Sequence, residues 1–139
     1  MAHASIGQIS VEYMVIIGFV TVITIPLIIV YSTFTQDSAD EINTAQAKQI
    51  AKKIVDAAES VYYLGEPSQT TLSVNVPDKL VLANFSSGKE VVFKVSTKSG
   101  KVDIVQNTRF NISGDFPTKA GSYTITIKAM PNYVNVSYK

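Results

Sequence analysis

The residue best placed to do chemistry in this sequence is Glu12, a lone carboxylate at the start of a long uncharged stretch. No charged residue follows it until Asp37, and most of the side chains between the two are Val, Ile, Leu, Phe or Met. A carboxylate beside hydrocarbon costs a few kcal/mol unless it reaches a headgroup layer or finds a cationic partner. From the residue alone, Glu12 suits either ion pairing or a position at an apolar–water boundary.

Catalytic side chains are sparse elsewhere. His3 is the only histidine and cysteine is absent, so the commonest general base and the thiol nucleophile are missing from most of the chain. The acidic residues Glu90, Asp103 and Asp115 are scattered and belong to no motif that would pair two carboxylates. We see no metal-ligand spacing and no phosphate-binding glycine loop. We therefore expect a protein that is not an enzyme and that uses no metal or cofactor.

Composition and charge narrow the class of protein further. A chain of 139 residues can form one core and one long helix but not two substantial cores. The formal charge is +1, and Lys52-Lys53 is the only cluster of basic residues. Such a charge distribution gives no electrostatic footprint for nucleic acid. One folded domain without nucleic-acid partners is expected.

The uncharged stretch is long enough to cross a membrane. Residues 13–34 form a helix of roughly 33 Å at 1.5 Å per residue, which matches a bilayer core. A secretory signal peptide would have a shorter apolar core followed by a cleavage site, so any cut should lie before this run. Pro26 removes one backbone hydrogen bond and should bend the helix near Val22 or Ile23, where threonine hydroxyls can meet the freed carbonyls.

An amphipathic helix continues beyond the apolar run. One apolar stripe recurs at spacings of three and four residues, and Gly65-Glu66-Pro67 ends it. The stripe consists of Ala47, Ile50, Ile54, Ala57, Val61 and Leu64. We expect it to pack against the rest of the same chain. The predicted helix covers residues 8–64, with an apolar part at 9–34 that could cross a membrane and an amphipathic part at 35–64.

The remaining residues, 65–139, alternate apolar and polar side chains between turn signals, which is typical of short antiparallel strands. Strands are predicted at residues 71–76, 79–84, 91–96, 102–106, 109–113, 122–129 and 133–138. Six or seven such strands favour a small β-sandwich or barrel. The segment 117–127 resembles the Ala-Gly-x-Tyr turn and strand of immunoglobulin-like domains. The predicted fold class is α+β, a lollipop-shaped chain with a long N-terminal helix and an antiparallel β-head.

Three sites in the β region could accept N-glycans if the chain is exported. Each is an Asn-x-Ser sequon: Asn84-Phe85-Ser86, Asn111-Ile112-Ser113 and Asn135-Val136-Ser137. About 1.3 sequons are expected by chance in a chain of this composition, so three sites favour modification.

The start of the helix carries a family resemblance. The run Gly7-Gln8-Ile9-Ser10-Val11-Glu12-Tyr13 resembles the Gln-x-Ser-x-Glu-[Tyr/Phe] box of archaeal type IV pilins with class III signal peptides. The resemblance implies a leader at residues 1–7 and a cut by a prepilin peptidase between Gly7 and Gln8. It further implies that Gln8, Ser10, Glu12 and Tyr13 serve recognition and assembly. In the family, the carboxylate corresponding to Glu12 neutralises the new amino group at Gln8. Unlike most leaders of this family, residues 1–7 contain no Lys or Arg.

The resemblance implies an archaeal adhesion pilus subunit that rests in the membrane and then joins an extracellular filament at the cell surface. Its partners would be further copies of itself as a helical polymer, the pilus assembly machinery and a surface or cell to which the filament attaches. Two alternatives stay open. One is a single-pass anchored extracellular β-domain that never polymerises, and the other is a minor pilin that caps or primes a filament.

Overall fold

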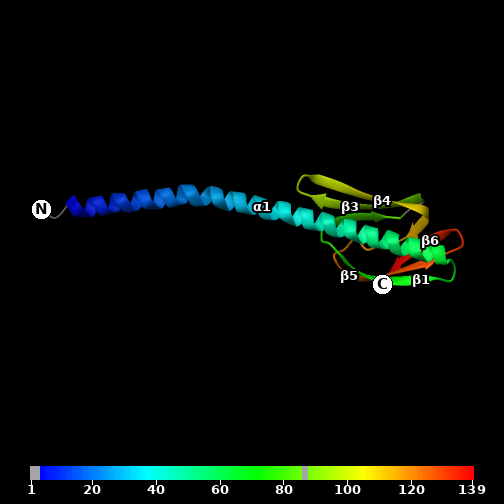
Figure 1. The fold of residues 1–139 in the computed structure, drawn as a ribbon. Coiled ribbons are helices and arrows are strands. Elements are labelled where there is room, and N and C mark those ends of the chain that lie inside the picture. The colour runs from blue at the N-terminus through cyan, green and yellow to red at the C-terminus, as the bar shows by residue number, and fades with distance from the viewer. Residues whose placement is uncertain (1–3, 86–87) are drawn as a thin grey trace. The chain divides into compact units, whose positions relative to one another are not determined.

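The computed structural model describes the backbone of residues 4–85 and 88–139, with side chains from Ser10 onward (Figure 1). One helix and six strands form in the order α1 (Ala4–Leu64), β1 (Gln69–Val76), β2 (Leu80–Asn84), β3 (Gly88–Thr97), β4 (Gly100–Gly114), β5 (Gly121–Ala129) and β6 (Tyr133–Tyr138). The chain divides into two compact units, an apolar helical unit (Met1–Ser38) and a β-domain (Ala39–Lys139) that includes the end of α1. A long apolar N-terminal helix followed by mostly antiparallel strands confirms the predicted α+β class.

The helix ends where the sequence predicts. Gly65 adopts a φ of +73°, a left-handed conformation that suits glycine, and its N–H donates to the carbonyls of Val61 at 3.1 Å and Tyr62 at 3.2 Å. These bonds satisfy carbonyls that the last helical turn would otherwise leave without a partner. At its other end α1 begins at Ala4, so its backbone is helical through the predicted cleavage point.

The C-terminal part of α1 packs against the sheet, as the apolar stripe predicts. Ala47, Ile50, Ile54 and Val61 are all at most 7% exposed. Two members of the expected stripe differ, because Ala57 is only half-buried and Leu64 is 72% exposed. Ala51 and Ala58 are buried instead, each at 0% exposure. Both lie on the same side of the helix as Ile54 and belong to the core that the helix shares with the strands.

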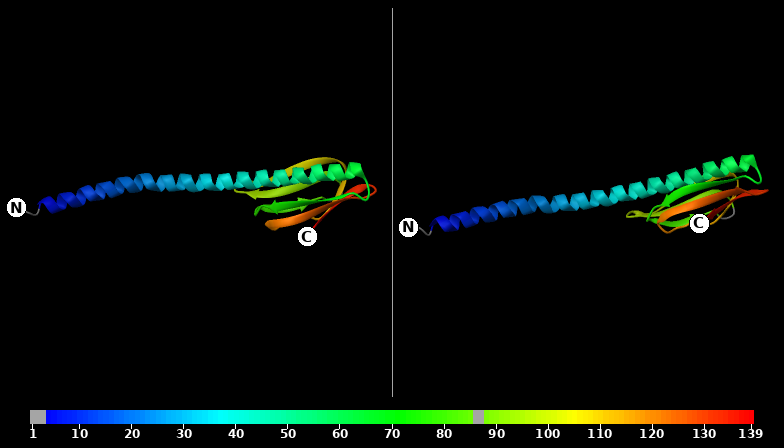
Figure 2. Two further views of the ribbon diagram at one scale, coloured as in Figure 1. Left: turned by 60° about the horizontal axis from the view of Figure 1, so that its bottom comes forward. Right: turned by 90° about the horizontal axis from the view of Figure 1, so that it is seen from below.

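The six strands form one sheet in the order β1-β5-β6-β4-β3-β2, in place of the predicted sandwich or barrel. Alternate residues of the strands point to a core that they share with α1, and residues 47–58 of α1 cover this face (Figure 2). A second sheet is therefore not needed to bury it. The segment 117–127 forms a loop and the start of β5 within this single sheet, so the immunoglobulin-like two-sheet arrangement is also replaced.

Strand β4 joins the two halves of the sheet. Its residues 100–107 pair antiparallel with β3, and its residues 111–114 pair parallel with β6. The sequence predicts separate strands at 102–106 and 109–113, and that prediction is wrong because the chain does not turn between them. Instead the pairing with β3 breaks: Glu90 pairs with Asn107 and Gly88 with Ile112, so Lys89 alone faces residues 108–111. This break is an enlarged β-bulge, which bends a strand toward a new neighbour.

Two contacts hold the bulge in shape. The Thr108 hydroxyl donates to the carbonyl oxygen of Phe110 at 2.6 Å inside the bulge. The Phe110 ring stacks on Tyr62 of α1, with ring centroids 4.6 Å apart and an angle of 16° between the planes. The bulge is thus fixed both by its own side chain and by the helix.

Candidate functional site

The residues of the pilin-like box lie on one uninterrupted stretch of α1. Gly7 and Gln8 fall where the backbone is helical, while the side chains before Ser10 are outside the described residues. Ser10, Glu12 and Tyr13 are all exposed. Because Tyr13 and Val11 flank the Glu12 carboxylate with 65% and 62% of their own surfaces exposed, the carboxylate lies at the edge of an apolar surface.

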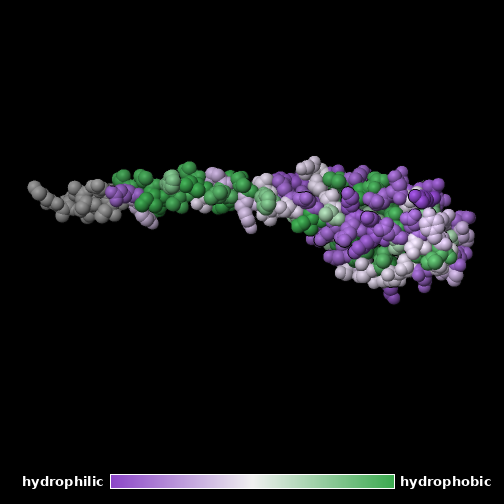
Figure 3. Space-filling view, in the orientation of Figure 1, coloured by the Kyte–Doolittle hydropathy of each residue, from purple (hydrophilic) through white to green (hydrophobic). Residues whose placement is uncertain are grey.

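That apolar surface covers the helix on every side. Each large apolar side chain from Val11 to Phe34 is between 46% and 76% exposed, and Figure 3 shows the resulting hydrophobic band. Soluble proteins rarely expose continuous apolar surface of this extent. The helix is also long and apolar enough to cross a membrane. Apolar surface on all sides of a helix is typical of a segment that lipid or other protein covers.

Several hydroxyls in and beside the apolar band bond within the helix. The Thr21 hydroxyl donates to the carbonyl of Ile17 at 2.8 Å. Pro26 frees a different carbonyl, that of Val22, which lies four residues before it in the helix. The helix stays continuous through Pro26, and a bend at that point remains a prediction. Further hydroxyl bonds to carbonyls three or four residues earlier run from Ser32 and Thr33 to Ile29 and from Thr35 to Tyr31. Such bonds let hydroxyls sit in an apolar medium without outside partners.

The three predicted glycosylation sites occupy different settings. Asn84 is exposed at the end of the edge strand β2, and Ser86 of its sequon lies outside the described residues. Asn111 and Asn135 lie on the adjacent central strands β4 and β6, where Ser113 of one sequon is the register partner of Asn135 of the other. Neighbouring strands are about 4.8 Å apart. Two glycans at Asn111 and Asn135 would therefore crowd one another.

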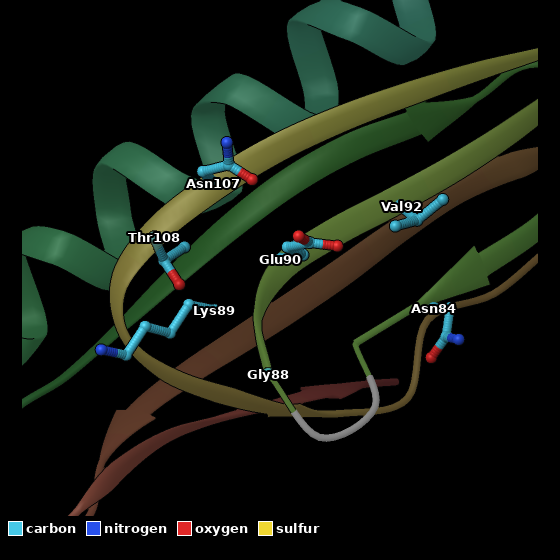
Figure 4. Close-up of a pocket in the computed structure, with 7 residues that line it drawn as sticks. All are labelled: Asn84, Gly88, Lys89, Glu90, Val92, Asn107 and Thr108. Atoms are coloured by element: carbon cyan, nitrogen blue, oxygen red, sulfur yellow. The ribbon is translucent and has the colours of Figure 1, made fainter.

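A pocket of about 600 Å³ opens beside the bulge of β4 (Figure 4). We call it the split pocket, and it is lined by Asn84, Gly88, Lys89, Glu90, Val92, Asn107 and Thr108. Its side chains come from β2, β3 and β4. Consecutive residues of a regular strand point to opposite faces, yet Lys89 and Glu90 both line it, as do Asn107 and Thr108. The register pairs Asn84–Val92 and Glu90–Asn107 lie on the face away from the core, and the broken pairing next to Glu90 adds Lys89 and Thr108 to the same lining.

The sequence gives no signal for the split pocket. Its polar side chains are spread over 25 residues of sequence, from 84 to 108, and only the long-range break in pairing brings them together. Within residues 4–85 and 88–139, no group of three or more His, Cys, Asp or Glu side chains could hold a metal ion. The pocket therefore offers hydrogen bonds and single charges.

Comparisons with known protein families, curated proteins and solved structures give no match for this chain.

Proposed function

We propose that this chain is a structural subunit of an archaeal type IV adhesion pilus, which polymerises through its N-terminal helix into an extracellular filament. The observation that carries the proposal is the apolar band from Val11 to Phe34, exposed on every side and headed by the Glu12 carboxylate. A lipid anchor requires only the apolar band and does not explain the carboxylate. In a filament core, a single carboxylate at the start of the helix can fix the register of neighbouring helices.

The energetics favour burial of the band between copies once a subunit leaves the lipid. Burying one large aliphatic or aromatic side chain stabilises by about 1.5–3 kcal/mol relative to exposure in water. The band contains many such side chains, from Val11 and Met14 to Tyr31 and Phe34. When identical subunits pack through unlike faces and the rotation between them does not close a ring, the contact repeats and forms a fibre. The β-domain would then lie outside the core, where it contacts other subunits and the surface to which the filament attaches.

The finer elements of the proposal follow the resemblance of the N-terminal box. A prepilin peptidase cuts between Gly7 and Gln8, and the assembly machinery extracts the mature subunit from the membrane. Gln8, Ser10, Glu12 and Tyr13 take part in recognition and assembly. The predicted N-glycans at Asn84, Asn111 and Asn135 would belong to the exposed β-domain.

A second candidate is a single-pass anchored β-domain that does not polymerise. The hydroxyl bonds of Thr21, Thr33 and Thr35 to carbonyls of their own helix favour it, because these three hydroxyls then need no partner helix in lipid. A minor pilin that primes or caps another filament shares the features of the first proposal and differs from it only in abundance.

The test is N-terminal sequencing and intact-mass measurement of protein sheared from cells, with electron microscopy of the same fraction. A mature start at Gln8 in material that forms filaments is the expected result. An intact Met1 in membrane-bound material without filaments would overturn the pilin proposal in favour of the anchored β-domain. A mature start at Gln8 in trace amounts, within filaments of another protein, would indicate the minor pilin.

A further inference from the structure

The split pocket lies within the β-domain and involves no residue of the apolar helical unit. Lys89 of β3 lies opposite residues 108–111 of β4, so four residues of β4 have no register partner in β3. The Thr108 hydroxyl bond and the stack of Phe110 on Tyr62 hold this arrangement. The split pocket opens beside these fixed contacts, on the face of the sheet that carries Glu90 and Asn107.

The side chains around the opening differ in the hydrogen bonds that they offer. The carboxylate of Glu90 only accepts, the ammonium of Lys89 only donates, and the amide of Asn107 does both. The Thr108 oxygen can still accept, since its proton is given to Phe110. Val92 adds one apolar contact, and Figure 4 shows how these side chains lie on β2, β3 and β4. Lys89, Glu90 and Asn107 are all exposed and within reach of a ligand from solvent.

This mixture discriminates between classes of ligand. An anion would meet the Glu90 carboxylate, and a cation would meet the Lys89 ammonium, so neither charge is favoured overall. An apolar ligand would find only Val92 and would remove several polar groups from water without replacing their hydrogen bonds. A ligand with many hydroxyl groups can accept from Lys89, donate to Glu90 and do both with Asn107. The volume of about 600 Å³ lies within the range of about 300–1,000 Å³ typical of small-ligand pockets.

We propose that the split pocket binds a neutral saccharide through Lys89, Glu90 and Asn107. The inference stands apart from the filament proposal, because it depends only on the β-domain. The bound saccharide can come from two sources. It can be a free glycan from the environment or a glycan attached to Asn84, which lines the same pocket.

The first arm of the experiment uses the full chain produced in a host without N-glycosylation and held in phosphocholine micelles, which contain no sugar. Glucose, galactose, mannose, N-acetylglucosamine and their disaccharides are titrated into the tens of millimolar while backbone amide NMR signals are followed. We expect at least one sugar to shift the amides of residues 88–92 and 105–110 in a saturable way. Glu90→Gln and Asn107→Ala should each lower the affinity for that sugar by about tenfold.

Two matched variants serve as controls in this arm. Glu66→Gln removes an exposed carboxylate in the turn after α1, and Asn75→Ala removes an exposed amide from strand β1. Neither should change the affinity. The amide spectra away from the pocket show whether each variant is folded, so a weaker affinity in a folded variant can be assigned to the pocket.

The second arm uses the chain purified from its native source. Nuclear Overhauser contacts between sugar protons and the methyl groups of Val92 or Thr108 would place a glycan attached to Asn84 in the pocket. Saturable binding in the first arm supports an external saccharide, and contacts in the second arm support the attached one. If no sugar shifts the pocket amides and no attached glycan contacts these methyl groups, the proposal is overturned. Equal affinities of the Glu90→Gln variant and the unaltered chain would also overturn it.

Discussion

Asp40 of α1 forms an ion pair with Lys79, which lies in the turn between β1 and β2. Its second carboxylate oxygen accepts a hydrogen bond from the backbone N–H of Lys98, in the turn between β3 and β4, at 2.7 Å. Asp40 is only 8% exposed, and its carboxylate links the helix to two turns of the sheet. The hydrogen bond from Lys79 is the main cause that lowers the pKa of Asp40 below its usual value of 3.8, the backbone bond from Lys98 adds to it, and burial opposes both.

Loss of this carboxylate should destabilise the β-domain in a pH-dependent way. Because the pKa of Asp40 is lowered on folding, its stabilising effect is complete above about 3.8 and is lost as the pH falls through the lower folded value. Asp40→Asn should therefore lower the melting temperature at pH 7 and have a smaller effect in strong acid. Thermal unfolding of the full chain in micelles, followed by circular dichroism, measures both.

The matched control for Asp40 is Asp103→Asn. Asp103 pairs with Lys94 at 3.2 Å, but its side chain is 48% exposed, and exposed pairs contribute little. This variant should leave the melting temperature nearly unchanged at both pH values. Equal losses in the two variants at pH 7 would contradict a special role for Asp40.

Gly114 is required by close packing at the parallel pair of β4 and β6. Its φ is +142°, and a Cβ atom there would lie 1.9 Å from the carbonyl oxygen of Val136. Gly114→Ala should therefore combine backbone strain with a backbone clash and lower the free energy of unfolding by about 3 kcal/mol or more. Denaturant unfolding measures the change.

Gly100→Ala separates the two contributions. Gly100 has a similar φ of +132°, but no atom lies within 4 Å of the position that a Cβ would take. This control should cost about 1–3 kcal/mol from backbone strain alone. A Gly114 variant no less stable than the Gly100 variant would show that β4 and β6 can separate without penalty.

The sequence predicts much of the fold because its strongest signals are local. The spacing of Ala47, Ile50 and Ile54 shows which face of the helix is buried, and Gly65 marks its end through its own conformation. The alternation of Tyr123, Ile125 and Ile127 similarly places β5 at nearly its observed bounds. Each of these signals lies within one helix or strand and needs no knowledge of distant neighbours.

The features that the sequence does not predict depend on contacts between distant residues. Alternation shows that a strand has one buried face, but it does not show whether a second sheet or a helix covers that face. The continuous β4 is missed for a related reason, since the segment around Asn107 and Thr108 changes its partner strand without a turn. Asp40 and Lys79 are 39 residues apart, and nothing in either local sequence indicates their pairing. The split pocket follows from the same change of partner and is equally hidden.

The two parts of α1 should respond differently to the same substitution. Ile54 is 0% exposed in the core of the β-domain, so Ile54→Ala should lower the free energy of unfolding by about 2–5 kcal/mol. Ile28 is 61% exposed in the apolar helical unit, and Ile28→Ala should leave the unfolding of the β-domain unchanged. Denaturant unfolding in micelles compares them. A similar loss in both variants would mean that the apolar unit also stabilises the β-domain.

Glu12 offers the sharpest test of what the apolar band does. In a lipid anchor the carboxylate only has to reach the membrane surface, so Glu12→Gln should leave membrane insertion and surface display unchanged. In a filament, the proposed ion pair between Glu12 and the amino group of Gln8 would be lost, which leaves a cation in the core without its partner. Breaking a buried pair in this way costs about 3–5 kcal/mol per subunit. Filaments should then be absent from the sheared fraction, although the cleaved subunit accumulates in the membrane.

The matched control is Asp37→Asn, which changes a carboxylate on the same helix just beyond the band and should leave filament yield intact. Normal filaments from the Glu12→Gln variant would show that the carboxylate has no part in assembly.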